Sequence, residues 1–249
     1  MPSFSLTKWY LDCVDAGGNV GIAYWARLRW RDLALTWSST IVVANGRTRT
    51  RSRVGRVAAP VIDGDALRYR TRDVEIAMTR RAPRFETELF GPELTWHCEM
   101  PRAEVVARFG DVELQGQGYA EVLQTSLLPW TLPIDELRWG RFTSASSSVV
   151  WIDWRGPKPL TLVLQDGRLA PCARVHDRSI DVGEDVRLTL DQTHVVRDEA
   201  IGASFSKVPL LGKRLPKRFT AAREQKWCSR GTLGASETGW SIHELVSFV

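Results

Sequence analysis

The chain has 249 residues, of which 43% are apolar and 25% charged, so it can form one large β domain or two smaller ones with separate cores. Its net charge is +5, no run of 18 apolar residues occurs, and the four cysteines are widely separated. These properties exclude a membrane-spanning helix, and they indicate neither a disulfide framework nor a zinc site.

Strand patterns begin near the N-terminus. Residues 20–30 alternate between a mainly apolar face and a second face, which is typical of a strand with a buried side. The turn residues 17–19 precede this segment, so residues 8–14 are expected to be its hairpin partner. Residues 33–43 form another strand, which the turn at residues 45–46 ends.

A row of alternating arginines follows this turn. Arg47, Arg49, Arg51 and Arg53 fall on one face of an extended strand, with Arg56 just beyond. We interpret the row as a basic edge strand that resists aggregation, or alternatively as a surface that attracts anionic lipid headgroups. A second basic group comprises Lys207, Lys213, Arg214, Lys217 and Arg218. No nucleic-acid-binding module appears, so nucleic acid is not an expected partner.

Short strands continue through the rest of the chain. Those before residue 129 are predicted at residues 67–78, 85–90, 94–99, 105–109 and 112–123. After a proline-rich crossing at residues 129–133, further strands are predicted at residues 147–154, 160–164, 186–190, 193–197, 217–227 and 240–248. Strands at this spacing, with turn residues between them, predict an all-β barrel or sandwich.

An internal repeat divides this series. Trp9 and Trp139 are 130 positions apart, as are Tyr24 and Trp154. The segment 118–123 resembles 239–246 once two inserted residues are allowed. Because the matches keep their order and a near-constant offset, we predict two similar β units, residues 1–129 and 130–249.

One carboxylate stands out because its strand is otherwise apolar. Glu121 shares a face with Tyr119 and Leu123. Apolar surroundings favour the protonated form of a carboxylate, which then serves as a general acid, for example towards an alkene. Glu121 and Tyr119 are therefore the candidate catalytic residues. Alternatively, Glu121 pairs with Arg138 or Arg141 and only holds the crossing in place.

Several other residues are candidates for substrate binding. Arg138 and Arg141 flank Trp139 and would hold a polar end of the substrate. His97 and Glu99 share a strand face as a possible acid/base pair. The remaining aromatic candidates for lining the pocket are Trp25, Trp37 and Trp96. The histidines lack metal-ligand spacing and no nucleotide-binding loop occurs, so neither a metal nor a cofactor is expected.

Four short segments spread over nearly the whole chain form a recognisable set: Lys8-Trp9-Tyr10-Leu11-Asp12, Gly118-Tyr119-Ala120-Glu121, Trp139-Gly140-Arg141-Phe142 and Ile242-His243-Glu244. The set resembles the lipocalin-like family that includes carotenoid 1,2-hydratase (hydroxyneurosporene synthase), AttH-like proteins and, more remotely, tocopherol cyclase. The resemblance implies two calycin-type β-barrel halves packed together around an apolar ligand. Enzymes of this type protonate, hydrate or cyclise isoprenoid-like substrates without a redox cofactor.

The sequence departs from the hydratases of that family around Glu121. They surround the acidic residue with histidine and then Asn-Trp-Gly, whereas this chain has Ala120, Val122, Leu123, Gln124 and Thr125. The polar groups that would position water are missing, so the resemblance favours cyclisation, isomerisation or plain binding over hydration.

These observations lead to one expectation for the whole protein. We expect an all-β chain of two tandem lipocalin-like antiparallel β-barrel units that acts on a hydrophobic small molecule, or alternatively carries it without catalysis. The first ten residues lack the basic start and apolar run of a signal peptide, so a cytoplasmic location is expected, with peripheral contact to anionic membranes through the arginine row. The sequence does not indicate an oligomeric state.

Overall fold

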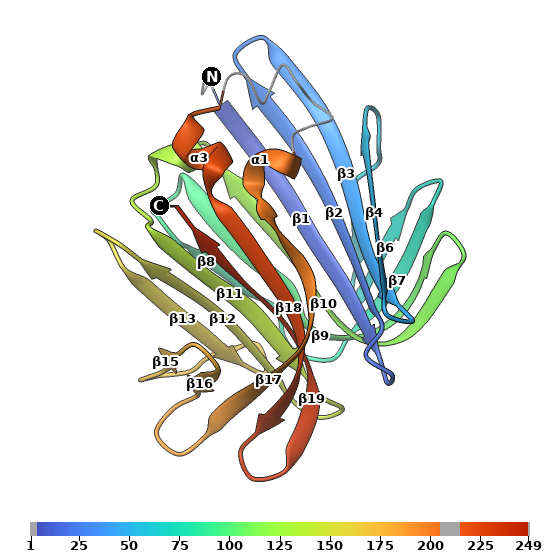
Figure 1. The fold of residues 1–249 in the computed structure, drawn as a ribbon, viewed down its shortest axis with the longest axis vertical. Coiled ribbons are helices and arrows are strands. Elements are labelled where there is room, and N and C mark those ends of the chain that lie inside the picture. Colours follow the sequence, from blue (N-terminus) through green and yellow to red (C-terminus); the bar gives the residue numbers. More distant parts are fainter. Residues whose placement is uncertain (1–3, 205–214, 249) are drawn as a thin grey trace. The chain divides into compact units, whose positions relative to one another are not determined.

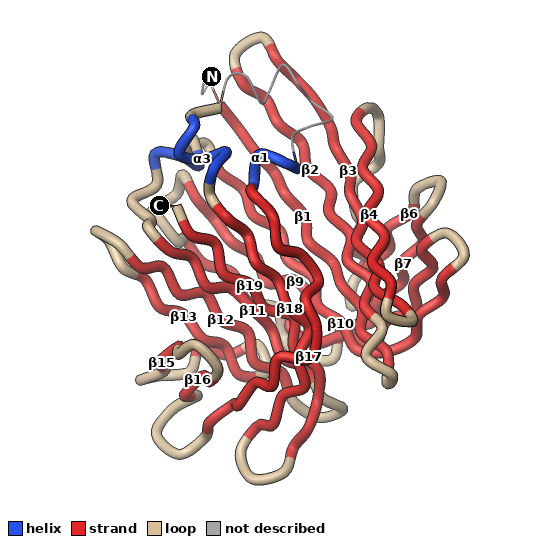
Figure 2. Tube along the Cα trace, in the orientation of Figure 1, coloured by secondary structure: helices blue, strands red, loops and turns tan. Residues whose placement is uncertain are grey.

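A computed structural model of the chain describes residues 4–204 and 215–248, apart from the side chains of residues 192, 193 and 204. The chain divides into two compact units, Met1–Leu128 and Pro129–Val249, with the division one residue before the expected position. Nearly all of the described chain is strand or turn (Figures 1 and 2). The prediction of an all-β fold is therefore confirmed, and each unit is described below by itself.

Unit 1 contains one antiparallel sheet of ten strands. Nine of them follow the order β4-β3-β2-β1-β10-β9-β7-β6-β5, and β8 pairs with β9 beyond β7. Their bounds are β1 (Phe4–Asp15), β2 (Val20–Trp30), β3 (Leu33–Ala44), β4 (Arg47–Val54), β5 (Val61–Asp63), β6 (Ala66–Arg70), β7 (Val74–Arg80), β8 (Phe85–Glu88), β9 (Leu94–Phe109) and β10 (Val112–Thr125).

Unit 2 contains a nine-stranded sheet in the order β14-β13-β12-β11-β19-β18-β17-β16-β15. Its strands are β11 (Glu136–Thr143), β12 (Ser148–Arg155), β13 (Leu160–Gln165), β14 (Arg168–Leu169), β15 (Arg174–Val175), β16 (Ser179–Asp181), β17 (Arg187–Ala200), β18 (Arg223–Leu233) and β19 (Glu237–Ser247). The described helices are short: η1 (Pro129–Thr131), α1 (Ile201–Ser204) and α3 (Lys217–Ala221).

The two sheets share one topology, which confirms the predicted repeat. In each, the first four strands of the unit lie side by side in chain order, from the first strand outward to the edge. The first strand pairs on its other side with the last strand of the unit, β10 or β19. Glu121 lies five residues after Gly116, and Glu244 lies five residues after Gly239, so these positions match without an insertion.

The ladder also corrects part of the predicted alignment. Glu121 is paired with Tyr10 on the first strand of its unit, whereas Glu244 is paired with Trp139. The structural counterpart of Trp139 is therefore Tyr10, and the neighbouring Trp9 points to the other face of its sheet. The predicted offset of 130 pairs Trp139 with Trp9 instead of Tyr10. This error of one residue matters, because it exchanges the two faces of a strand.

One face of each sheet carries a continuous apolar core, here called the core face. In unit 1 this core includes Leu11, Trp25, Met100 and Ala120, and in unit 2 it includes Phe142, Trp151, Val163, Ile180 and Leu188. The opposite face of the central strands is buried as well, at Tyr10, Tyr24, Trp96 and Tyr119. Central strands buried on both faces explain why apolar residues occur at successive positions in β1, β2 and β12.

Four strand predictions are wrong, and each has a local reason. Residues 186–190 and 193–197 belong to one strand, β17, because its pairing with β18 shifts register between them without ending the strand. Residues 94–99 and 105–109 belong to one strand, β9. The interruption between them is a bulge: Pro101, which cannot donate to a ladder, lies where the β9–β10 register shifts. Residues 67–78 are two strands, since the chain turns where the Thr71 amide bonds to the Val74 carbonyl. The segment 217–227 begins as the helix α3, and its strand starts at Arg223.

The arginine row forms β4, which ends the sheet of unit 1, so the predicted basic edge strand is confirmed. Arg49 bonds to Asp111 at 2.8 Å, and Arg51 lies 3.8 Å from Asp73. These pairs tie the edge strand to the turns beside β7 and β10, so the row is partly neutralised. Its binding to anionic membranes stays a prediction.

The second basic group is only partly described. Lys207, Lys213 and Arg214 lie outside the described residues, whereas Arg218 pairs with Asp135 at 2.9 Å. Within the described part of the chain, no helix has the length and apolar composition needed to cross a membrane.

Candidate functional site

Glu121 lies in a small cluster of buried side chains on the face of unit 1 opposite the core face. Its Oε2 accepts a hydrogen bond from the indole Nε1 of Trp96 at 2.5 Å and another from the Tyr119 hydroxyl at 2.7 Å. Trp96, Cys98 and Tyr119 are almost completely buried, and Cys98 is the ladder partner of Glu121 on β9. We call these four residues the Glu121 cluster.

Irregular backbone pairing positions this cluster. Between Gly118 and Glu121 the β9–β10 register shifts twice, so β9 carries extra residues there. At the first shift the amide of Tyr119 donates to the carboxylate of buried Asp12 at 3.1 Å. Beyond the shifts, Trp96 and Cys98 share the face of Glu121. Bulges of this kind often redirect side chains beside functional sites.

Burial sets the protonation of the two neutral partners. The pKa of Tyr119 is raised well above its usual value near 10 by burial, and further by Cys98 and Glu121. The pKa of the Cys98 thiol is raised by burial and then by Glu121. Both groups therefore keep their protons near neutral pH, and Tyr119 and Trp96 remain donors to the carboxylate. Glu121 is the one carboxyl group of the cluster.

Aromatic rings extend from the cluster across the neighbouring strands. Tyr119 lies 6.0 Å from Tyr10, Tyr10 lies 5.3 Å from Tyr24, and Tyr24 stacks on Trp37 at 6.4 Å between ring centroids. Lys8 lies 5.4 Å from the Tyr24 centroid, which is a cation–π contact. Because ring faces stabilise positive charge, the row beside Glu121 suits a reaction that develops a carbocation.

Other predicted site residues of unit 1 lie elsewhere. Trp25 packs in the core of the opposite face and donates its Nε1 to the Val57 carbonyl at 2.9 Å. His97 pairs with Glu86 at 3.4 Å rather than with Glu99. Glu99 lies at the register shift without a ladder partner on β10, which breaks the alternation that predicted a shared face.

The three candidates on β11 belong to unit 2 and contact residues of that unit. Arg138 bonds to Glu136 at 2.7 Å and to Asp177 at 2.5 Å. Arg141 is completely buried, and its NH1 donates to the Thr143 hydroxyl at 3.0 Å and to the Trp240 carbonyl at 2.9 Å.

Trp139 lies beneath a buried ion pair on the face of unit 2 opposite its core. The ammonium of Lys226 lies 5.4 Å from the Trp139 ring centroid, pairs with Glu244 and lies 3.6 Å from Glu224. Glu244 therefore has a cation as its main partner.

A pocket of about 270 Å³ opens on the core face of unit 2, and sequence reasoning missed most of it. Its aromatic walls are Trp151, Trp227 and His243. The predicted residue Arg138 also lines it. The one sequence feature that marks the pocket is Gly140. In the structure, a Cβ at this position would lie 2.2 Å from the Trp151 ring and 2.7 Å from the His243 Cβ. The glycine leaves space for both rings.

His243 is the buried titratable group of this pocket. Its ring stacks on Trp227 at 5.3 Å, and its Nε2 lies 2.9 Å from the Ser229 hydroxyl. Burial, and to a lesser degree the charge of Lys226, lowers the pKa of His243 to about 4. The imidazole is therefore neutral near pH 7. Among the described residues, no group of three or more His, Cys, Asp or Glu side chains could hold a metal ion.

Comparison with known proteins supports the fold. Neither a family profile nor a curated protein matches the sequence. An AttH-like protein from Nitrosomonas europaea matches with a TM-score of 0.61 and 11% identity, over 99% of this chain and 93% of that one. Kievitone hydratase from Nectria haematococca matches with a TM-score of 0.52 and 10% identity, over 97% and 88%. CghA, solved with Sch210972, matches with a TM-score of 0.58 and 11% identity, over 99% and 89%.

At these identities the likeness concerns the fold. The protein has the lipocalin-like, two-unit β architecture of these structures, as the sequence predicted.

Proposed function

We propose that this protein is a cofactor-independent acid/base enzyme that acts on a hydrophobic, isoprenoid- or polyene-like small molecule. Glu121 is the proton-transfer group, and Tyr119 and Trp96 orient its carboxylate. The observation that carries the proposal is the pair of hydrogen bonds from these buried neutral donors to one oxygen of Glu121. These hydrogen bonds fix the orientation of the carboxylate, so that its oxygens are held in one place for proton transfer.

The chemistry follows from this arrangement. Protonated Glu121 donates its proton to one alkene carbon, and the π electron pair forms the new C–H bond. The adjacent carbon becomes a carbocation, which the aromatic row stabilises. The carboxylate then removes a proton from a neighbouring carbon, so the substrate is isomerised or cyclised with no net oxidation. Water capture is less favoured, because Leu123, the next residue on the face of Glu121, supplies no polar group to hold it.

The similar structures support an enzyme over other roles. Kievitone hydratase is named for a hydratase activity, and CghA was solved with Sch210972. The same fold therefore occurs in a protein named as an enzyme and in one solved with a bound compound.

The test is incubation with a panel of polyprenyl alcohols and linear polyenes in deuterated water. Mass spectrometry should find deuterium in an isomerised or cyclised product only when the wild-type protein is present. Glu121→Gln should lower turnover by at least ~100-fold, because general acid catalysis contributes about 10²–10⁴-fold. Tyr119→Phe should lower it by about tenfold, since it removes the hydroxyl that donates to Glu121.

The matched control is Glu88→Gln, which removes an exposed carboxylate of the same unit and should leave turnover unchanged. Full activity of a folded Glu121→Gln protein would exclude the proposed role. Tight binding of a polyene without deuterium uptake by the wild type would indicate a carrier instead.

A further inference from the structure

The pocket of unit 2 is built independently of the Glu121 cluster. All of its lining residues belong to unit 2, and they come from β11, β12, β17, β18, β19 and the β15–β16 hairpin. The proposed reaction uses none of them. The pocket therefore needs an explanation of its own.

The inner walls are flat and apolar. Trp151 and Trp227 lie on either side of His243, with ring centroids 6.4 and 5.3 Å from the imidazole. The aliphatic side of the pocket is formed by Val175, Ile180 and Leu190, all buried. Aromatic walls with an aliphatic side suit a planar ring system. A volume of about 270 Å³ is at the small end of ligand pockets, which favours a ligand of one or two rings.

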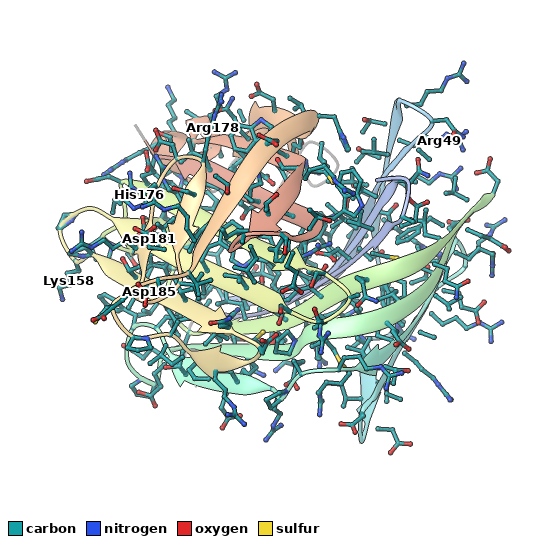
Figure 3. All side chains as sticks on the ribbon, turned by 90° about the horizontal axis from the view of Figure 1, so that it is seen from below. Arg49, Lys158, His176, Arg178, Asp181 and Asp185 are labelled. Carbon is teal, nitrogen blue, oxygen red and sulfur yellow. The ribbon has the colours of Figure 1, made fainter. Side chains whose placement is uncertain are left out.

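The rim is polar and carries an available positive charge. Arg138 is occupied by Glu136 and Asp177, and His176 lies 2.9 Å from Asp181. Arg178 lines the pocket from the same hairpin, is exposed, and has no ion pair or side-chain hydrogen bond with any residue in the described ranges. Figure 3 labels His176, Arg178 and Asp181, which all come from this hairpin and β16.

The charges around the pocket favour an anion. Two arginines line it; Glu136 and Asp177 occupy Arg138, so Arg178 supplies the positive charge that remains for a ligand. Glu244 also lines the pocket, but buried Lys226 neutralises it. An arginine can bind a carboxylate through two parallel hydrogen bonds.

We propose that unit 2 contains a second ligand site that binds a small planar aromatic carboxylate. The ring packs against His243 and the two flanking tryptophans, Trp151 and Trp227, and the carboxylate bonds to Arg178 at the rim.

The test uses three probes that share one ring system: 2-naphthoate, 2-naphthalenemethanol and 2-naphthylmethylammonium. Isothermal titration calorimetry, together with quenching of tryptophan fluorescence, should show 2-naphthoate binding at least ~10-fold more tightly than the alcohol. The ammonium probe should bind most weakly. Arg178→Gln should weaken 2-naphthoate binding by about tenfold and leave the alcohol unchanged, because it removes the charge and keeps the apolar walls.

Two further variants separate the walls from the rim. Leu190→Phe fills the pocket and should abolish binding of all three probes, with circular dichroism as the check on folding. Arg168→Gln removes an exposed arginine of β14 that does not line the pocket, and should change nothing.

Other outcomes would overturn the proposal. These are absence of 2-naphthoate binding to the wild type at millimolar concentration, equal affinity for the ammonium probe, or unchanged 2-naphthoate affinity in Arg178→Gln. Because Arg178 is exposed, that variant tests the site even if Leu190→Phe does not fold. Glu121→Gln should bind 2-naphthoate normally, so failure of the proposed reaction would leave this site untouched.

Discussion

At the scale of single residues, two glutamates at equivalent positions have different chemistry. Glu121 is held by the indole of Trp96 and the phenol of Tyr119, whereas Glu244 is paired with the buried ammonium of Lys226. A buried ion pair fixes the charge of its carboxylate, because removing either charge leaves the other uncompensated. The repeat predicted that the positions correspond, and the structure shows which side chains bond to each carboxylate.

His243 should make stability depend on pH. Its folded-state pKa is about 4, below the ordinary 6.5, because burial disfavours the imidazolium. Between pH 6.5 and 4 the unfolded chain binds a proton that the folded protein does not, so the free energy of unfolding falls as pH falls. The loss attributable to His243 should be on the order of 3 kcal/mol by pH 4, and none of it should appear above pH 7.

Urea unfolding between pH 4 and 8 would measure this loss. His243→Phe should have a shallower dependence across that range, because it removes the titrating group. Identical slopes for His243→Phe and the wild type would contradict the assignment.

At the scale of secondary-structure elements, alternation in the sequence predicted strands but not their irregularities. The pattern located β2, β3 and β12 well, because a strand with a regular ladder keeps its period of two. It divided β9 in two, because the bulge around Pro101 breaks that period without ending the strand. At the same bulge Glu99 has no ladder partner on β10, whereas His97 is paired with Val122.

Two glycines determine how closely adjacent central strands approach. A Cβ on Gly116 would lie 2.0 Å from the Val14 carbonyl oxygen, and one on Gly239 would lie 2.2 Å from the Thr143 carbonyl oxygen. Since these contacts are with backbone, the strands themselves would have to separate. Gly116→Ala and Gly239→Ala should each lower the free energy of unfolding by about 3 kcal/mol or prevent folding.

Gly17→Ala is the matched control for these substitutions. Its added Cβ would come no closer than 3.3 Å to the Asp15 side chain, and the glycine lies in an exposed turn. It should change the free energy of unfolding by less than about 0.5 kcal/mol. Wild-type stability of both the Gly116 and Gly239 variants would show that the strands are further apart than described.

At the scale of the whole molecule, the same topology occurs twice with different side chains. Each unit has its first and last strands at the centre of its sheet, and its edges lie far from them in the strand order. Central strands have hydrogen-bonded neighbours on both sides and buried residues on both faces, whereas edge strands have a neighbour on one side only.

Hydrogen exchange should follow this order in both units. Amides of β1, β10, β11 and β19 should exchange most slowly, and those of β4, β5, β14 and β15 fastest, because edge strands open locally at a lower free energy. Mass spectrometry with peptide resolution would measure the rates. Equal protection of β4 and β1 would contradict the described strand order.

The sequence alone determined the all-β class, the two-unit repeat, the basic edge strand and the position of Glu121 in an apolar strand. These features follow from local patterns, because alternation and turn residues act over a few positions. Only the tertiary structure decided which side chains meet: Trp96 reaches Glu121 from 25 positions away, and the pocket around His243 assembles six segments of unit 2. The register of strand pairing determines which side chains come into contact, and a shift of one residue exchanges the two faces of a strand.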